Sequence, residues 1–332
     1  MATDGRIPGD EPKPGLTGWA ARVSLGRGFQ PVASEFLLLS GATLALTMFG
    51  LVMVLSASSA NDTAAGVGAY DSLLRQGTFA IIAVPAMFIV SRFPVRFFKR
   101  IAWIALLGAL ALQALVFTPL GVESGGNRNW INVAGMNLQP SELLKLALAL
   151  WLGFTLARKH ELLTSWKHLF FPTVPVAIVA ILSVLAGSDL GTAMILVLIV
   201  LSALFFAGVR LRMFIVPVAL GILAVAALAI TSPDRMRRIM SFLDTGSLAC
   251  YAEDCFQPLH GVWGLAGGGI FGLGLGNSKE KYDWLPAAAN DYIFAIVGEE
   301  LGLIGCIVVL ALFGLFAVGA FRIVRRTDDP FV

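Results

Sequence analysis

The chain has 332 residues, of which 57% are hydrophobic and 14% charged, and its mean hydropathy is +0.82. Soluble globular proteins contain about 45–50% apolar and about 25% charged residues, so this composition excludes a disordered chain and a water-soluble fold. The apolar residues form continuous runs instead of alternating with polar residues, which excludes an outer-membrane β-barrel. The net charge of +3 is too small to indicate a nucleic-acid partner.

Eight apolar segments follow a polar tail. Residues 1–35 are rich in glycine, proline and charge, and we expect them to form a disordered cytoplasmic tail without a cleaved signal peptide. A helix needs about 20 residues to cross about 30 Å of hydrocarbon. Segments near that length lie at about 36–57, 73–93, 101–118, 140–158, 170–187, 190–209, 212–231 and 291–321. The sequence therefore predicts an all-α, polytopic membrane domain over residues 36–322 and a cytoplasmic end at 323–332.

Basic residues indicate the orientation of these spans. Most of the 24 Lys and Arg residues lie in the tail and in alternate connections, whereas the opposite short loops hold Arg75 and Arg128. Because cytoplasmic loops carry the excess of positive charge, both termini are expected in the cytoplasm. Two connections, 119–139 and the long 232–290, then lie outside. Long connections are usually functional.

Lys145 is a basic residue inside a predicted span. A charge at that depth costs about 2.5–3.5 kcal/mol on insertion scales and is a functional candidate by default. The alternative is that Lys145 only pairs with Glu142, which shares its helix face three residues earlier. Asp189 lies between two spans, and the sequence is equally compatible with a helix cap and with a cavity-facing group.

Three further basic residues lie beside tryptophan in the outer connections. Arg128 precedes Trp130, and its guanidinium suits a phosphate contact. Lys279 and Lys281 precede Trp284 and are candidates for holding an anionic head group. In each case the alternative is a solvated charge next to an interfacial aromatic residue.

The same outer region contains glycine and cysteine in unusual density. Segment 261–276 holds eight glycines, but no strand precedes it, so it is not a dinucleotide-binding fingerprint and instead favours tight backbone bends. Cys250 and Cys255 share the outer loop, where a disulfide is compatible with an oxidising compartment. Whether they pair is left open by the sequence. Cys306 lies in an apolar span and is expected to pack inertly.

Acidic residues mark the last span. Asp291 lies where the long outer loop enters it, and a helix cap is the simplest alternative to a functional role. Glu299 and Glu300 follow about 12 Å further along the helix. Acidic groups in an apolar run indicate an interior or cavity-facing position. Small residues that allow close helix approach flank them, namely Gly298, Gly302 and Gly305.

Five ordered motifs between about residues 36 and 321 resemble the SEDS family (shape, elongation, division and sporulation), and its FtsW branch more than its RodA branch. They lie at 126–131 with 139–145, at 189–193, at 237–243, at 274–278 and at 285–302. The resemblance implies the SEDS fold and a peptidoglycan glycosyltransferase that polymerises lipid II during septal cell-wall synthesis. It also implies an extracytoplasmic active site on the bacterial cytoplasmic membrane, and as partners a class B penicillin-binding protein and other division proteins.

The resemblance maps the family's essential acid onto Asp291, which we expect to act as general base. The polyprenyl pyrophosphate leaving group needs cations, for which Lys145, Arg128 and a Mg²⁺ or Mn²⁺ ion are candidates. The other residues expected to bind substrate are Glu142, Asp189, Lys279, Lys281, Asn290, Glu299 and Glu300.

The chain departs from the family pattern in three places. Ser188 stands where the family usually has a proline before the motif at 189–193. Alanines occupy 287–289, where the family usually has a histidine and an acid or Asn before the pair that ends in Asp291. The family has ten spans and this sequence predicts eight, so we expect either a fragment or a shortened member. Two alternatives to the glycosyltransferase stay open: a lipid II flippase that uses the same intramembrane charges, and an inactive scaffold that recruits division proteins.

Overall fold

The computed structural model describes residues 34–124, 127–133, 136–162, 165, 171–230, 236, 240, 251, 255–282 and 284–332. The predicted tail therefore lies outside the described residues except for its last two, which already belong to the first helix. The long helices are α1 (Ser34–Ala64), α2 (Asp71–Val90), α3 (Val95–Leu115), α4 (Pro140–Arg158), α6 (Thr173–Leu185), α7 (Leu190–Phe206), α8 (Ile215–Ile230), α11 (Phe256–Gly267) and α12 (Ile293–Arg326). Short 3-10 helices span His160–Leu162 and Leu211–Met213.

Each of the eight predicted spans coincides with one of these helices, which confirms the predicted helical membrane fold. Helices α1, α2, α4 and α12 are long and apolar enough to cross a membrane, and α6 and α7 are shorter apolar helices. Helix α2 has no buried residue, and its Ile81 is 75% exposed. Its apolar side chains therefore form a surface that lipid can cover. The backbone groups of a helix are satisfied internally, so only its side chains need to match the hydrocarbon.

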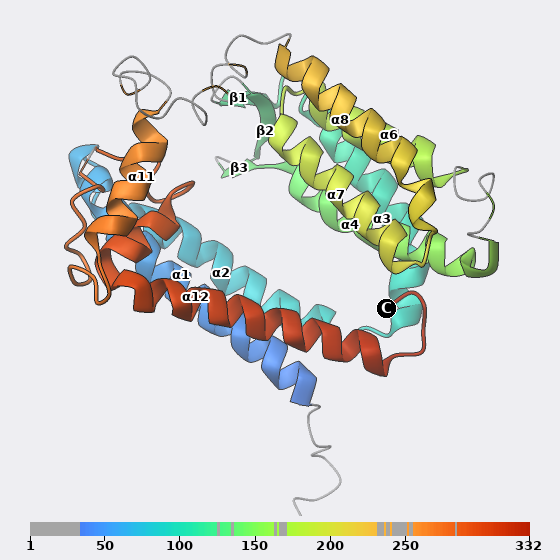
Figure 1. Cartoon of the computed structure of the whole chain (residues 1–332), viewed down its shortest axis with the longest axis horizontal. Coiled ribbons are helices and arrows are strands. Elements are labelled where there is room, and N and C mark those ends of the chain that lie inside the picture. Colours follow the sequence, from blue (N-terminus) through green and yellow to red (C-terminus); the bar gives the residue numbers. More distant parts are fainter. Residues whose placement is uncertain are drawn as a thin grey trace, which may run out of the picture.

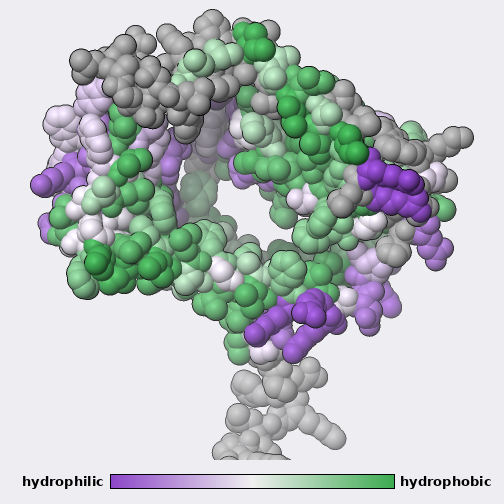
Figure 2. Space-filling model, in the orientation of Figure 1, coloured by the Kyte–Doolittle hydropathy of each residue, from purple (hydrophilic) through white to green (hydrophobic). Residues whose placement is uncertain are grey.

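The helices pack in two groups (Figure 1). Helices α1, α2, α11 and α12 form one group, and α3, α4, α6 and α7 form the other. Each group has its own buried core, with Trp151 in the core around α4 and Ile296 in the core around α12. Figure 2 shows hydrophobic surface along both groups and an opening between them.

The end of α12 connects the two groups. Arg326 forms an ion pair with Glu35 at the start of α1, so these two helix ends lie at the same end of the molecule. Beyond α12, Lys99 Nζ in α3 donates to the Asp329 carboxylate at 2.6 Å and lies 5.4 Å from the centre of the Phe331 ring. The last residues therefore fold back onto the second group.

The attachment of this last segment is expected to weaken in acid. The hydrogen bond from Lys99, followed by that from the Phe331 amide, lowers the pKa of Asp329 below its ordinary 3.8. Because the pKa of Asp329 is lower in the attached state, the ionised carboxylate stabilises the attachment at every pH above its ordinary pKa. This stabilisation is lost as the pH falls through the lowered pKa. A nitroxide label on Val332→Cys, in a chain whose Cys250, Cys255 and Cys306 are changed to Ser, should be restrained at neutral pH and mobile in strong acid. With Lys99→Met it should be mobile already at neutral pH, and identical spectra would contradict the prediction.

The connection between α3 and α4 contains a small sheet that was not predicted from the sequence. Strands β1 (Gly121–Ser124), β2 (Asn127–Val133) and β3 (Met136–Leu138) form an antiparallel sheet in the order β1-β2-β3. Ile131 pairs with Gly121 on one side and with Leu138 on the other. The Arg128 amide donates to the Gly187 carbonyl at 3.0 Å, which docks β2 on the turn between α6 and α7.

Helix α12 is broken at Gly302, whereas the sequence predicted one continuous span with Gly302 as a packing residue. Its backbone angles, φ 67° and ψ −165°, lie outside the helical region. The loop that follows α11, residues 268–276, binds the backbone groups that the break leaves free. The amides of Leu273 and Gly274 donate to the carbonyls of Glu299 and Glu300, both at 2.9 Å. From the other side, the Leu303 and Ile304 amides donate to carbonyls in this loop. Groups exposed by a broken helix must find partners at membrane depth, and here the loop provides them.

Candidate functional site

Asp291 lies on a tight turn that leads into α12. The turn is anchored by Leu285 and Ala288, which are buried in the core shared with Ile296. The amides of Asn290 and Asp291 both donate to the Ala287 carbonyl, at 3.0 and 3.1 Å. Asp291 itself is exposed, and Tyr292 rather than Asp291 occupies the N-cap position of α12. The carboxylate is therefore held at the surface and is free of the capping role that was its simplest alternative.

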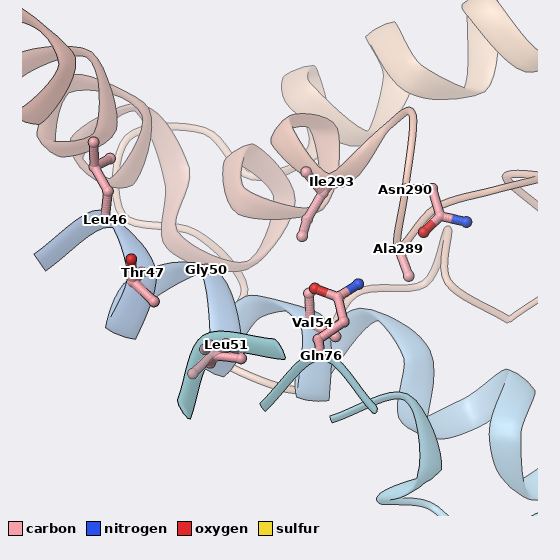
Figure 3. A pocket seen from close by; sticks show the side chains of 10 residues that line it. Leu46, Thr47, Gly50, Leu51, Val54, Gln76, Ala289, Asn290 and Ile293 are labelled. Atoms are coloured by element: carbon pink, nitrogen blue, oxygen red, sulfur yellow. The ribbon is translucent and has the colours of Figure 1, made fainter. Parts of the chain in front are cut away.

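A cavity of about 440 Å³ lies beside this turn. Figure 3 shows side chains of α1 and Gln76 of α2 facing the segment that carries Ala289, Asn290 and Ile293. The cavity is lined by Leu46, Thr47, Gly50, Leu51, Val54, Gln76, Ala80, Ala289, Asn290 and Ile293. Most of them are apolar and only a few are polar, as is usual in small-molecule sites. Asn290 and Ile293 lie one residue before and two residues after Asp291, so Asp291 belongs to a segment that lines the cavity without being one of the lining residues itself.

Tyr292 packs between this turn and α11. Its ring lies against Gly261, where even a Cβ atom would come within 2.7 Å of the ring carbons. Burial, and then the negative charge of Asp291, raise the pKa of the Tyr292 phenol above its ordinary 10.0. At neutral pH the phenol therefore keeps its proton next to the carboxylate.

Glu299 and Glu300 are buried, in agreement with the predicted interior position. Glu300 lies 3.1 Å from Lys281 Nζ, and the Lys279 amide donates to Glu299 at 2.8 Å. Lys281, which was predicted to contact a head group, is buried instead of facing the solvent. The Lys279 side chain is exposed, as that prediction requires.

The remaining predicted residues belong to the second group of helices. Glu142 and Lys145 form an ion pair of 2.8 Å in which Lys145 is 21% exposed and Glu142 59%. The Asp189 side chain caps α7 by accepting the Thr192 amide at 2.9 Å. Arg128 is exposed, and its guanidinium donates to the Thr118 carbonyl at 2.9 Å.

The predicted site residues thus form separate sets. Lys281, Glu299 and Glu300 meet at the break in α12, and Glu142 meets Lys145 on α4. Within the part of the chain that the structure describes, no hydrogen bond or ion pair joins Asp291 to Lys145 or Arg128. A bound molecule would have to bridge the two groups of helices to bring these residues to one reaction.

The described residues offer no group of three His, Cys, Asp or Glu side chains arranged to hold a metal ion. The Mg²⁺ or Mn²⁺ ion that was a candidate from the sequence therefore stays a prediction. Cys306 is a free, buried cysteine, as predicted. Cys250 lies outside the described residues, so its pairing with Cys255 stays a prediction.

Several polar residues near the break in α12 were not singled out from the sequence. Ser56 in α1 and Ser278 in the segment between α11 and α12 both contact the buried carboxylates. His260 Nδ1 lies 2.7 Å from Glu280 Oε2. A hydroxyl in an apolar span is a weak signal, because it usually bonds its own helix backbone. Only the folded structure shows that Ser56 faces Glu300.

Comparison with known proteins supports one family. A family model named for FtsW, RodA and SpoVE and described as "Cell cycle protein" matches residues 37–332. A Mycobacterium tuberculosis protein named "Probable peptidoglycan glycosyltransferase FtsW" is 36% identical over 309 residues, which are 93% of this chain and 58% of that protein. The Geobacter metallireducens protein of the same name is 36% identical, over 87% of this chain and 76% of its own length. "Stage V sporulation protein E" of Bacillus subtilis is 34% identical, over 89% of this chain and 81% of its own length.

Solved structures agree at the level of the fold. A chain of a peptidoglycan synthase complex that coordinates polymerization and crosslinking has a TM-score of 0.70 at 21% identity, covering 88% of this chain and 79% of that chain. The rod shape determining protein RodA of Thermus thermophilus has a TM-score of 0.60 at 21% identity, covering 89% of this chain and 77% of that chain. The chain spans only 58% of the length of the Mycobacterium relative. With the family model matching nearly the whole chain, this protein belongs to the FtsW/RodA/SpoVE family of cell cycle proteins.

Proposed function

We propose that this chain acts as a peptidoglycan glycosyltransferase that polymerises lipid II on the outer face of the bacterial cytoplasmic membrane, in cell division. The observation that carries the proposal is an exposed carboxylate, Asp291, in a segment that lines a mostly apolar cavity. An amphiphile with a lipid tail and a sugar head matches that combination. The names of the FtsW relatives support the same chemistry. Apolar helices and family membership support the location in the membrane.

Asp291 would act as general base on the acceptor sugar. The carboxylate takes the proton of the acceptor 4-hydroxyl, whose oxygen then forms a bond to the anomeric carbon of the donor. The bond between that carbon and the pyrophosphate breaks, and the polyprenyl pyrophosphate leaves with the electron pair. A positioned base typically contributes about 10²–10⁴-fold to such a rate.

Lys145 and Arg128 would stabilise the leaving pyrophosphate from the second group of helices. Both lie at the end of that group where the sheet docks, Lys145 near the start of α4 and Arg128 on β2. Fixed cations at a developing negative charge stabilise the transition state more than the ground state. The substrate would then occupy the space between the two groups, with its sugars toward Asp291.

Lys145→Met is expected to lower kcat by about 10²–10³-fold, the usual cost of removing one transition-state donor. Glu142→Gln should cost much less, because Glu142 only orients the ammonium. If the pair had a packing role alone, both variants would lose activity equally. Steady-state polymerisation rates of the two variants and of the double variant decide between these outcomes.

Polymerisation in detergent tests the proposed function directly. Purified chain would be mixed with labelled lipid II, with and without a class B penicillin-binding protein, and glycan strands separated on a gel. Polymer in the absence of any bilayer supports the glycosyltransferase. Transfer of lipid II across vesicles without polymer would instead support a flippase. Binding of the penicillin-binding protein or other division proteins without polymer would support a scaffold.

A further inference from the structure

A buried ion pair joins segment 276–292, which lies between α11 and α12 and contains Asp291, to helix α12. Lys281 Nζ lies 3.1 Å from Glu300 Oε1, and the two side chains are 3% and 0% exposed. The Lys281 ammonium also donates to the Gly276 carbonyl at 2.6 Å. Charges removed from water are costly unless they are paired. Each member of this pair therefore depends on the other.

The same carboxylates also bind the backbone of the segment. The Ser278 amide donates to Glu300 at 3.3 Å, and the amides of Lys279 and Glu280 donate to Glu299 at 2.8 and 3.4 Å. The Ser278 hydroxyl donates to Glu299 as well. Three successive amides thus end on two side chains of α12, which fixes the register of the segment on that helix.

Glu300 extends the attachment to the wall of the cavity. The Ser56 hydroxyl of α1 lies 2.8 and 2.6 Å from the two carboxylate oxygens. Val54, two residues earlier, lines the cavity beside Asp291. Further along the segment, Leu285 is buried in the core between α1 and α12. One buried carboxylate therefore contacts α1 and the segment that leads to Asp291.

We propose that Lys281 and Glu300 are positioning residues, whose buried ion pair holds segment 276–292 on α12 and α1 and so fixes the position of Asp291 next to the residues that line the cavity. The inference rests on the proposed function, since it takes Asp291 as the base. Neither residue of the pair touches the reacting atoms, and both act through the backbone between them and Asp291. Displacement of a reacting group by about 1 Å costs about 10²-fold in rate.

Two variants separate positioning from stability. Lys281→Met removes the ammonium and leaves the Glu300 carboxylate unpaired. Lys281→Met with Glu300→Gln removes both charges and keeps a polar group that Ser56 can contact. Arg75→Met is the matched control, because Arg75 belongs to an exposed pair with Asp71 on α2 and its side chain is 75% exposed. The measurements are the hydrogen exchange of amides 277–292, Tm, and kcat and KM for lipid II polymerisation.

Lys281→Met should raise the exchange rates of amides 278–280, lower Tm and reduce kcat by about 10²-fold with little change in KM. In the double variant Tm should recover, because no unpaired charge remains buried, while kcat stays low because the ion pair no longer holds the segment. Arg75→Met should alter none of these quantities.

Unchanged exchange in Lys281→Met would overturn the proposal, and so would a kcat that recovers together with Tm in the double variant. Failure of the proposed function gives a different result, in which the unmodified chain makes no polymer at all. In that case the exchange rates still decide whether the ion pair holds the segment.

Discussion

Asp291→Asn is expected to lower the rate of lipid II polymerisation by about 10²–10⁴-fold, because the amide cannot accept the proton of the acceptor hydroxyl. The substitution keeps the size of the side chain and leaves the turn intact, since that turn is held by backbone bonds to Ala287 and by buried Leu285. The loss should therefore appear in kcat, with Tm unchanged. Polymer length and yield from labelled lipid II in detergent measure the effect.

Asp71→Asn is the matched control for this variant. Asp71 is an exposed carboxylate at the start of α2, where it pairs with Arg75 at 3.0 Å. Removal of an exposed ion pair costs about 0–1 kcal/mol of stability, and we expect full polymerising activity. Undiminished polymer from Asp291→Asn would refute the role of general base while leaving the family assignment untouched.

The helices of this protein were predictable from sequence because each carries its own signal. A run of about 20 apolar residues satisfies its backbone as a helix and its surface in lipid, independently of the rest of the chain. The small sheet between α3 and α4 gave no such signal. Its longest strand has seven residues, and its docking depends on the distant Gly187 carbonyl.

The candidate site was predictable in its chemistry but not in its connections. Acidic groups within an apolar run pointed to an interior position for Glu299 and Glu300, and both are buried. Their partners were not visible, because Ser56 lies 244 residues before Glu300 and its contact exists only after α1 and α12 pack. The burial of Lys281 is likewise a property of the tertiary structure, so the sequence alone predicts a contact with a head group.

The break in α12 also depends on tertiary contacts that the sequence does not reveal. Gly302 reads as a small packing residue in sequence, yet its conformation depends on a loop some 30 residues earlier that takes up the broken hydrogen bonds. Its φ of 67° and ψ of −165° fall in a region that is essentially restricted to glycine. A Cβ atom there would also overlap the backbone of Ile270 and Gly272.

Gly302→Ala is therefore expected to destabilise the protein strongly. The backbone conformation costs roughly 1–3 kcal/mol for a residue with a side chain, and the overlap with the loop costs roughly another 1–3 kcal/mol. Together these predict a fall in Tm of about 10 °C. Because the loop that is pushed away also borders the segment leading to Asp291, polymerisation should fall with stability. Thermal unfolding in detergent and the polymerisation assay measure the two effects.

Gly314→Ala provides the control on the same helix. A Cβ atom at position 314 meets nothing within 4 Å, and the residue lies in the regular part of α12. Alanine is favoured over glycine in a helix interior by roughly 0.5–1 kcal/mol, so this variant should be as stable as the unmodified chain or slightly more stable. Equal Tm values for the two variants would mean that α12 runs straight through Gly302. The loop after α11 would then have no free backbone groups of α12 to bind, and Glu299 and Glu300 would not be placed to bind segment 276–292.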